Sequence, residues 1–122
     1  MNIYEKKFNL LLLLGLLLTA GTVAYAAPAG QSDLERGKAL YRGHCAACHG
    51  LDGSGNGPKA STMTPPPTNF RNPAVMSALT NNDLEQAILA GKAGTAMKGY
   101  GTIFKSRDVA NLVLYLRSLA SP

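Results

Sequence analysis

The stretch HCAACH at positions 44–49 contains both cysteines and both histidines of this 122-residue chain. Two alanines separate Cys45 from Cys48, so the two thiols lie close to one helical turn apart, and His49 follows directly. On a helical turn, two thiols and one imidazole with this spacing can converge on the same group. The fold is therefore expected to be organised around whatever this turn holds.

Four kinds of site could use this cluster. A Cys45–Cys48 disulfide would close a very small loop, the arrangement that stabilises a fold least. A thioredoxin-like redox pair would need a strand before the motif, and no strand is predicted there. Zinc sites usually take their ligands from two separated segments. The pattern C-x-x-C-H is instead the attachment signature of c-type haem, in which the imidazole ligates the iron. The cluster thus favours one haem c, tethered covalently through Cys45 and Cys48, with His49 as an iron ligand and His44 as a bystander.

The N-terminal segment is typical of a secretory leader. It has a basic start with Lys6 and Lys7, an apolar run over residues 10–20, and the small-x-small sequence Ala-Tyr-Ala at 24–26. We expect a signal peptide over residues 1–26 and an exported, periplasmic domain over residues 27–122. A retained membrane anchor is the alternative, although the run is short for a spanning helix.

Charge and size narrow the class of protein further. Twelve Lys and Arg against seven Asp and Glu give a net charge of +5, and the basic residues are dispersed rather than clustered. Dispersed charge with few aromatic residues argues against nucleic-acid binding. A domain of under about 100 residues has a lean apolar core and often needs a cofactor to complete it.

The pattern of helix signals predicts an all-α fold. Ser32 to Glu35 reads as a capping box before a helix over about 33–44, and Thr80 with Asp83 reads as a second box before a helix that ends at Gly91. A third helix is expected over about 106–119, with a buried apolar stripe made of Val109, Leu112, Val113, Leu116 and Ala120. The Gly- and Pro-rich stretch 50–73 can only be a long loop. About three main helices and long loops would then surround one haem.

These features together resemble a monohaem class I cytochrome c over almost the whole exported part. The matching stretches are GKALYRGHCAACHG, GSGNGP, GTAMKGY and VLYLRSL. The resemblance implies that the first and last helices cross closely at Gly37 and Tyr41. It also implies that a proline carbonyl, here that of Pro58, orients the iron-ligating histidine.

The second iron ligand is expected from a methionine. Met97 lies in a glycine-containing loop between two predicted helices, at the position matching the family's methionine ligand, although Lys98 stands where many family members have proline. Met63 and Met76 remain as alternative ligands, and packing beside an apolar cofactor is the ordinary role of such residues.

The expected function is electron transfer by a non-enzymatic carrier. A monomeric periplasmic protein would exchange single electrons with redox proteins in transient contacts, with His49 and Met97 both staying on the iron. Two alternatives stay open: a haem subunit of a larger oxidoreductase, or an open-iron haem enzyme or ligand sensor if Met97 does not ligate.

Overall fold

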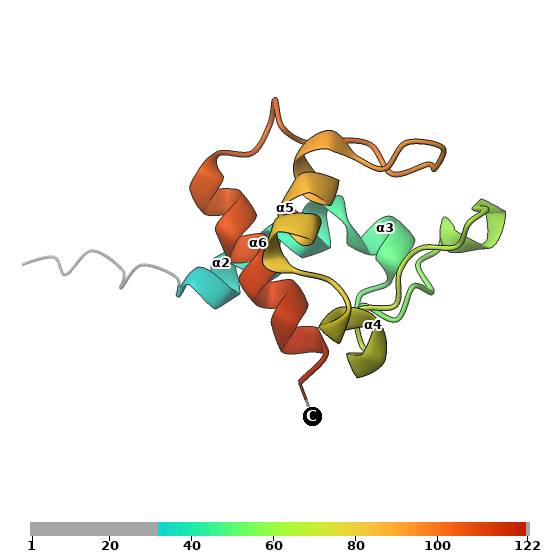
Figure 1. Cartoon of the computed structure of the whole chain (residues 1–122), viewed down its shortest axis with the longest axis horizontal. Coiled ribbons are helices and arrows are strands. Elements are labelled where there is room, and N and C mark those ends of the chain that lie inside the picture. The colour runs from blue at the N-terminus through green and yellow to red at the C-terminus, as the bar shows by residue number, and fades with distance from the viewer. Residues whose placement is uncertain (1–31, 122) are drawn as a thin grey trace, which may run out of the picture. The chain divides into compact units, whose positions relative to one another are not determined.

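The computed structural model describes residues 32–121 of the chain, so the predicted signal peptide over residues 1–26 lies outside the described residues. The described part is helical, as predicted, and its only β-type pairing is an isolated antiparallel bridge between Gly91 and Lys98. No helix in this part is long and apolar enough to cross a membrane. Residues 32–121 contain five α-helices and one 3-10 helix (Figure 1): α2 Asp33–His44, α3 Ala46–His49, η1 Ala60–Thr62, α4 Pro73–Ser77, α5 Asn81–Ala90 and α6 Ser106–Leu119.

The helix starts and stops follow the predicted capping signals. The Ser32 hydroxyl accepts a hydrogen bond from the Glu35 N–H at the start of α2. At the start of α5 the capping box is complete, because the Asp83 N–H donates to the Thr80 hydroxyl oxygen at 3.1 Å while the Asp83 carboxylate accepts from the Thr80 N–H at 2.8 Å. Gly91 ends α5 with φ +74°, a conformation that favours glycine. The predicted helix boundaries are therefore confirmed.

The helices α2 and α6 cross closely at Gly37. Both helices pass side by side (Figure 1), and a Cβ placed on Gly37 would lie 2.0 Å from the backbone oxygen of Asn111. Next to this contact, Tyr41 is fully buried and its ring lies 5.2 Å from the ring of Tyr115. The predicted close crossing is confirmed. Leu34, about one turn before Gly37 on α2, remains over a third exposed.

The apolar stripe of α6 forms much of the core. Its predicted members are buried except for Ala120, which is half-buried. The remaining core side chains come from α2, α4, α5 and the loops between them. The buried α6 residues of the stripe are Val109, Leu112, Val113 and Leu116.

A single arginine ties α6 to the connection between α4 and α5. The Arg117 guanidinium donates to the backbone oxygens of Met76 and Leu79 and to the side-chain oxygen of Asn81. These bonds satisfy carbonyls that the short helix α4 and the following turn leave without helical partners. They also fix the position of Leu79, whose side chain faces the cavity described below.

Candidate functional site

The two cysteines and His49 share one turn of helix. Cys45 lies between α2 and α3, and its carbonyl accepts hydrogen bonds from the N–H groups of Cys48 at 3.2 Å and His49 at 3.0 Å. Both thiols are free and half-buried. Burial raises the pKa of Cys45 to about 11, with the neighbouring Cys48 adding to the effect, so this thiol is protonated at neutral pH. The turn thus presents the protonated Cys45 thiol and the Cys48 thiol beside an imidazole.

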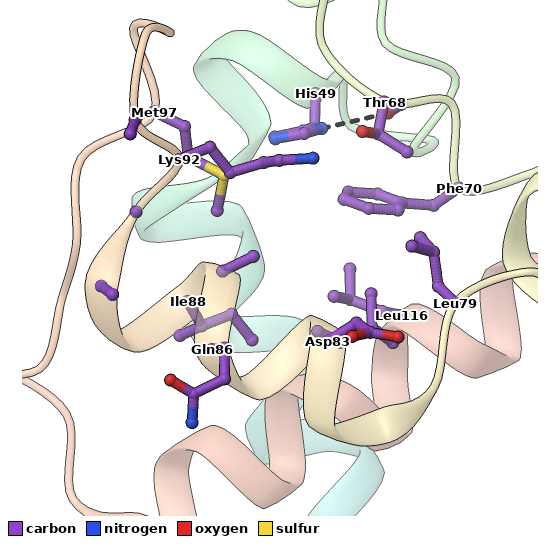
Figure 2. Close-up of a pocket in the computed structure, with 15 residues that line it drawn as sticks. His49, Thr68, Phe70, Leu79, Asp83, Gln86, Ile88, Lys92, Met97 and Leu116 are labelled. Atoms are coloured by element: carbon purple, nitrogen blue, oxygen red, sulfur yellow. Dashed lines mark hydrogen bonds between the residues drawn. The ribbon is translucent and has the colours of Figure 1, made fainter.

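His49 is held as a neutral imidazole with one defined tautomer. Its Nδ1 lies 3.1 Å from the carbonyl oxygen of Thr68 (Figure 2). Because a carbonyl can only accept, Nδ1 must carry the proton, which leaves the lone pair on Nε2 free for a metal. Burial lowers the pKa of His49, and the hydrogen bond to Thr68 opposes that shift.

The prediction that Pro58 provides this carbonyl is wrong. The residues on either side of Pro58 are bonded to α3 instead, with the Gly57 N–H donating to the Cys48 oxygen at 3.1 Å and the Lys59 N–H to the Ala47 oxygen at 2.9 Å. These bonds hold the Pro58 turn against the end of α3. The carbonyl that reaches the His49 ring comes from Thr68, farther along the same loop.

The loop folds back on itself to bring Thr68 to the histidine. The Gly55 N–H donates to the His49 oxygen at 2.7 Å, and the Phe70 N–H donates to the Gly53 oxygen at 2.8 Å. Gly55 has φ +83°, and a Cβ there would meet the Pro67 oxygen at 2.7 Å. Only glycine allows the two legs of the loop to pass this closely.

Phe70 is a second residue that the sequence did not single out. Its ring is buried and stacks on the His49 ring, with centroids 4.5 Å apart and planes at 24°. The only sequence signal for Phe70 was its aromatic side chain inside an otherwise polar and Pro-rich loop. An aromatic side chain in such a loop usually packs against another buried group. Thr68 carried no such signal, because its contribution is a backbone atom.

A cavity of about 450 Å³ opens beside the His49 ring. Figure 2 shows His49 at one end of the cavity, with side chains from α5 and the flanking loops around it. Besides His49, four polar residues border it: Thr68, Asp83, Gln86 and Lys92. Cys45, Cys48 and Pro58 are not among the lining residues, although both cysteines share the His49 turn. The larger apolar lining residues are Phe70, Leu79, Leu84, Ile88, Met97 and Leu116.

Met97 is the methionine that the structure brings to this cavity. It lies in the loop after α5, is half-buried, and directs its sulfur into the same space as the His49 ring (Figure 2). Met76 is 2% exposed in the core and Met63 belongs to the Pro-rich loop, and neither lines the cavity. The cavity therefore has one imidazole and one thioether at its border.

His44 points to a separate cluster of aromatic side chains. It is exposed at the end of α2, and its ring packs edge-on against Phe104 and Tyr100, with centroids 5.0 and 5.8 Å away. The Tyr100 hydroxyl donates to the His44 backbone oxygen at 3.0 Å. The cavity lining does not include His44.

The family pattern described as Cytochrome c matches residues 34–120, which is well over half of the chain and contains the whole site. The chain belongs to the cytochrome c family. Its helical fold and its C-x-x-C-H turn agree with that assignment, and this cytochrome carries one covalent c-type haem.

This cytochrome resembles a small part of a much longer protein. Dihydro-heme d1 dehydrogenase of Pseudomonas aeruginosa is 37% identical over 108 residues, which cover 86% of this chain and 18% of the enzyme. The structure of dihydro-heme d1 dehydrogenase NirN in complex with DHE aligns with a TM-score of 0.55 and 32% identity, over 67% of this chain and 16% of that chain. This cytochrome thus spans less than a fifth of the curated relative.

Two further solved structures are similar in fold. The Kuenenia stuttgartiensis reducing HAO-like protein complex Kustc0457/Kustc0458 gives a TM-score of 0.59 at 28% identity, over 70% of this chain and 41% of that chain. The KustC0563 c-type cytochrome gives 0.59 at 22% identity, over 70% of this chain and 98% of that chain. The second likeness shows similarity of fold alone.

The residues of this cytochrome fit a haem. The cavity lies within the range of 300–1,000 Å³ of small-molecule and cofactor sites, and its lining is mainly apolar, as a porphyrin requires. Two free thiols stand on the turn that carries the histidine. Neutral imidazole and thioether are donors that suit haem iron. Cys45 and Cys48 would hold the macrocycle, and His49 and Met97 would hold the iron.

Proposed function

We propose that this cytochrome transfers single electrons between redox proteins, with a haem c tethered by Cys45 and Cys48 and ligated by His49 and Met97. The observation that carries the proposal is the pairing of a tautomer-fixed imidazole and a thioether at one apolar cavity. When bound, the haem supplies a one-electron couple between ferrous and ferric iron, at a potential that thioether ligation raises.

The chain's own residues keep the site suited to electron transfer rather than to substrate chemistry. Thr68 holds the His49 ring in one orientation, which limits rearrangement when the charge of the site changes. Phe70 and the apolar side chains of α5 give the cavity a mainly apolar wall beside the His49 ring. Because two ligands come from the protein, the site has no open position for a substrate. These features favour a carrier over an enzyme or a ligand sensor.

The spectrum of the ferric holoprotein tests the ligand assignment. The wild type should show the weak far-red absorption band of iron–thioether ligation and should bind carbon monoxide slowly in its ferrous form. Met97→Leu should remove the band and speed the binding of carbon monoxide, whereas Met63→Leu, a change in a loop away from the cavity, should do neither. A wild type without the band, with rapid carbon monoxide binding, would favour the open-iron alternative.

We propose export to the periplasm for the same protein. The support is the leader-like sequence over residues 1–26. The mass of the purified holoprotein tests this directly. Cleavage after Ala26 should leave a chain that begins at Ala27 and carries one haem, and a mass that includes residues 1–26 would favour the anchored alternative.

A second candidate is the haem subunit of a larger oxidoreductase. Two comparisons favour it. The curated relative carries the matching segment within a much longer enzyme. A similar solved structure belongs to a protein complex. Electron transfer by the haem would be the same, but with a fixed partner. Gel filtration of the native protein from its own cell extract separates the two, since a free carrier should elute as a small monomer and a subunit should co-elute with its partner.

A further inference from the structure

The loop that carries Met97 is a closed hairpin. Its two ends meet at the Gly91–Lys98 bridge, and the Lys92 N–H donates to the Met97 carbonyl at 3.1 Å. A Cβ on Gly91 would come within 2.5 Å of that same carbonyl oxygen, so the backbone of Met97 rests directly against the end of α5. The carbonyl group of Met97 is therefore held in place within the hairpin.

The Thr95 side chain holds the N–H group of Met97. Its hydroxyl accepts a hydrogen bond from the Met97 N–H at 3.2 Å and donates to the Lys92 carbonyl at 2.8 Å. The Thr95 N–H also donates to the Lys92 carbonyl, at 3.1 Å. The hydroxyl thus bridges the two legs of the hairpin and engages the one backbone donor of Met97.

We propose that Thr95 is a positioning residue that presents the Met97 thioether to the cavity, an inference that rests on the proposed role of Met97 as iron ligand. A ligand on a free loop loses conformational entropy each time it binds, and a loop already ordered by hydrogen bonds avoids part of that loss. Without the hydroxyl, the Met97 N–H has no partner and the hairpin loses its cross-link. The thioether should then leave the iron more readily.

Imidazole competition on the ferric holoprotein measures this directly, because imidazole can bind only when Met97 has left. Thr95→Val keeps the shape of the side chain and removes the hydroxyl. Since it deletes two hydrogen bonds, each with a modest net contribution, imidazole should bind on the order of tenfold more tightly. The limiting rate at saturating imidazole should rise as well. Thr95→Ser, which keeps the hydroxyl, should restore wild-type values.

Thr102→Val is the matched control, because Thr102 is an exposed threonine on the turn that follows the hairpin. It should leave both imidazole parameters unchanged. The proposal is overturned if Thr95→Val binds imidazole like Thr102→Val while Met97→Ala binds it much more tightly, and in that case the ligand assignment stands. It is also overturned if Thr95→Ser behaves like Thr95→Val. If the wild type has no far-red band and Met97→Ala binds imidazole as the wild type does, the ligand assignment itself fails, and the role of Thr95 fails with it.

Discussion

Replacing Gly37 by alanine tests whether the α2–α6 crossing limits the stability of this cytochrome. The added Cβ would lie 2.0 Å from the Asn111 backbone oxygen and 3.0 Å from the Tyr115 Cβ, whereas ordinary contact begins at 3.4 Å. The oxygen belongs to the backbone of α6 and cannot rotate away. The two helices must therefore move apart by more than 1 Å at the place where Tyr41 and Tyr115 pack.

Two opposing effects set the size of the change. Alanine favours a helix interior over glycine by roughly 0.5–1 kcal/mol, which would stabilise α2. Overpacking of a well-packed contact costs about 1–3 kcal/mol and sometimes more. Because the clash is with backbone, the upper part of that range applies, and we expect Gly37→Ala to lower the free energy of unfolding by about 2 kcal/mol.

Gly43→Ala supplies the matched control on the same helix, since a Cβ there would meet no atom within 4 Å. It should gain up to about 1 kcal/mol from helix propensity alone. Guanidinium unfolding of both holoproteins, followed by far-UV circular dichroism, gives the free energies and the m-values. Equal stability of the two variants, or a more stable Gly37→Ala, would refute the reasoning that the crossing depends on glycine.

Four other changes have defined outcomes. Thr80→Ala removes the α5 N-cap and should lower the free energy of unfolding, measured with guanidinium, by about 1 kcal/mol. Thr80→Ser keeps a capping hydroxyl and should retain most of the wild-type stability. Arg117→Gln deletes charged hydrogen bonds to α4 and the following turn and should cost about 1.5–3 kcal/mol. Hydrogen bonds from the Thr80 hydroxyl and N–H lower the pKa of Asp83 in the folded protein. The ionised Asp83 therefore stabilises the fold above about pH 4, the pKa of an unfolded Asp, and this contribution is lost as the pH falls through the pKa of the folded state. Asp83→Asn should accordingly reduce the loss of stability at acid pH in a plot of unfolding free energy against pH. Cys45→Ala with Cys48→Ala, purified without haem, should lack a cooperative thermal transition by circular dichroism.

The parts of the fold that could be predicted are those with local causes. The caps at Ser32 and Thr80 lie next to the helices they start, and the glycine that ends α5 acts through its own φ angle. The close crossing was predictable only through the family resemblance. The four-residue helix α3 was not predicted, because its hydrogen bonds start from Cys45 immediately after the preceding helix ends.

The site divides along the same line. The cysteines and His49 form one contiguous motif, so chemistry alone identified them as a set. The carbonyl that contacts the His49 ring was predicted to be that of Pro58 and is that of Thr68. Every residue type carries a backbone carbonyl, so the sequence does not indicate which one contacts the ring. Which carbonyl arrives depends on the return path of the loop, which is set by close backbone approaches such as Gly55 to Pro67.

The cavity walls connect the function of this cytochrome to its folding. Leu84, Ile88 and Leu116 are buried core side chains, and the same three residues line the cavity. Any group that fills the cavity therefore completes the hydrophobic core from inside, at roughly 25 cal/mol for each Å² of apolar surface it covers. The His49 and Met97 donors stand at the border of this shared surface. The Thr68 carbonyl and the Phe70 ring hold the His49 ring, and hairpin hydrogen bonds hold the Met97 backbone. Substitutions in the core should thus change stability and haem retention together, whereas removal of the Thr95 hydroxyl should change ligand exchange with little effect on the global free energy of unfolding.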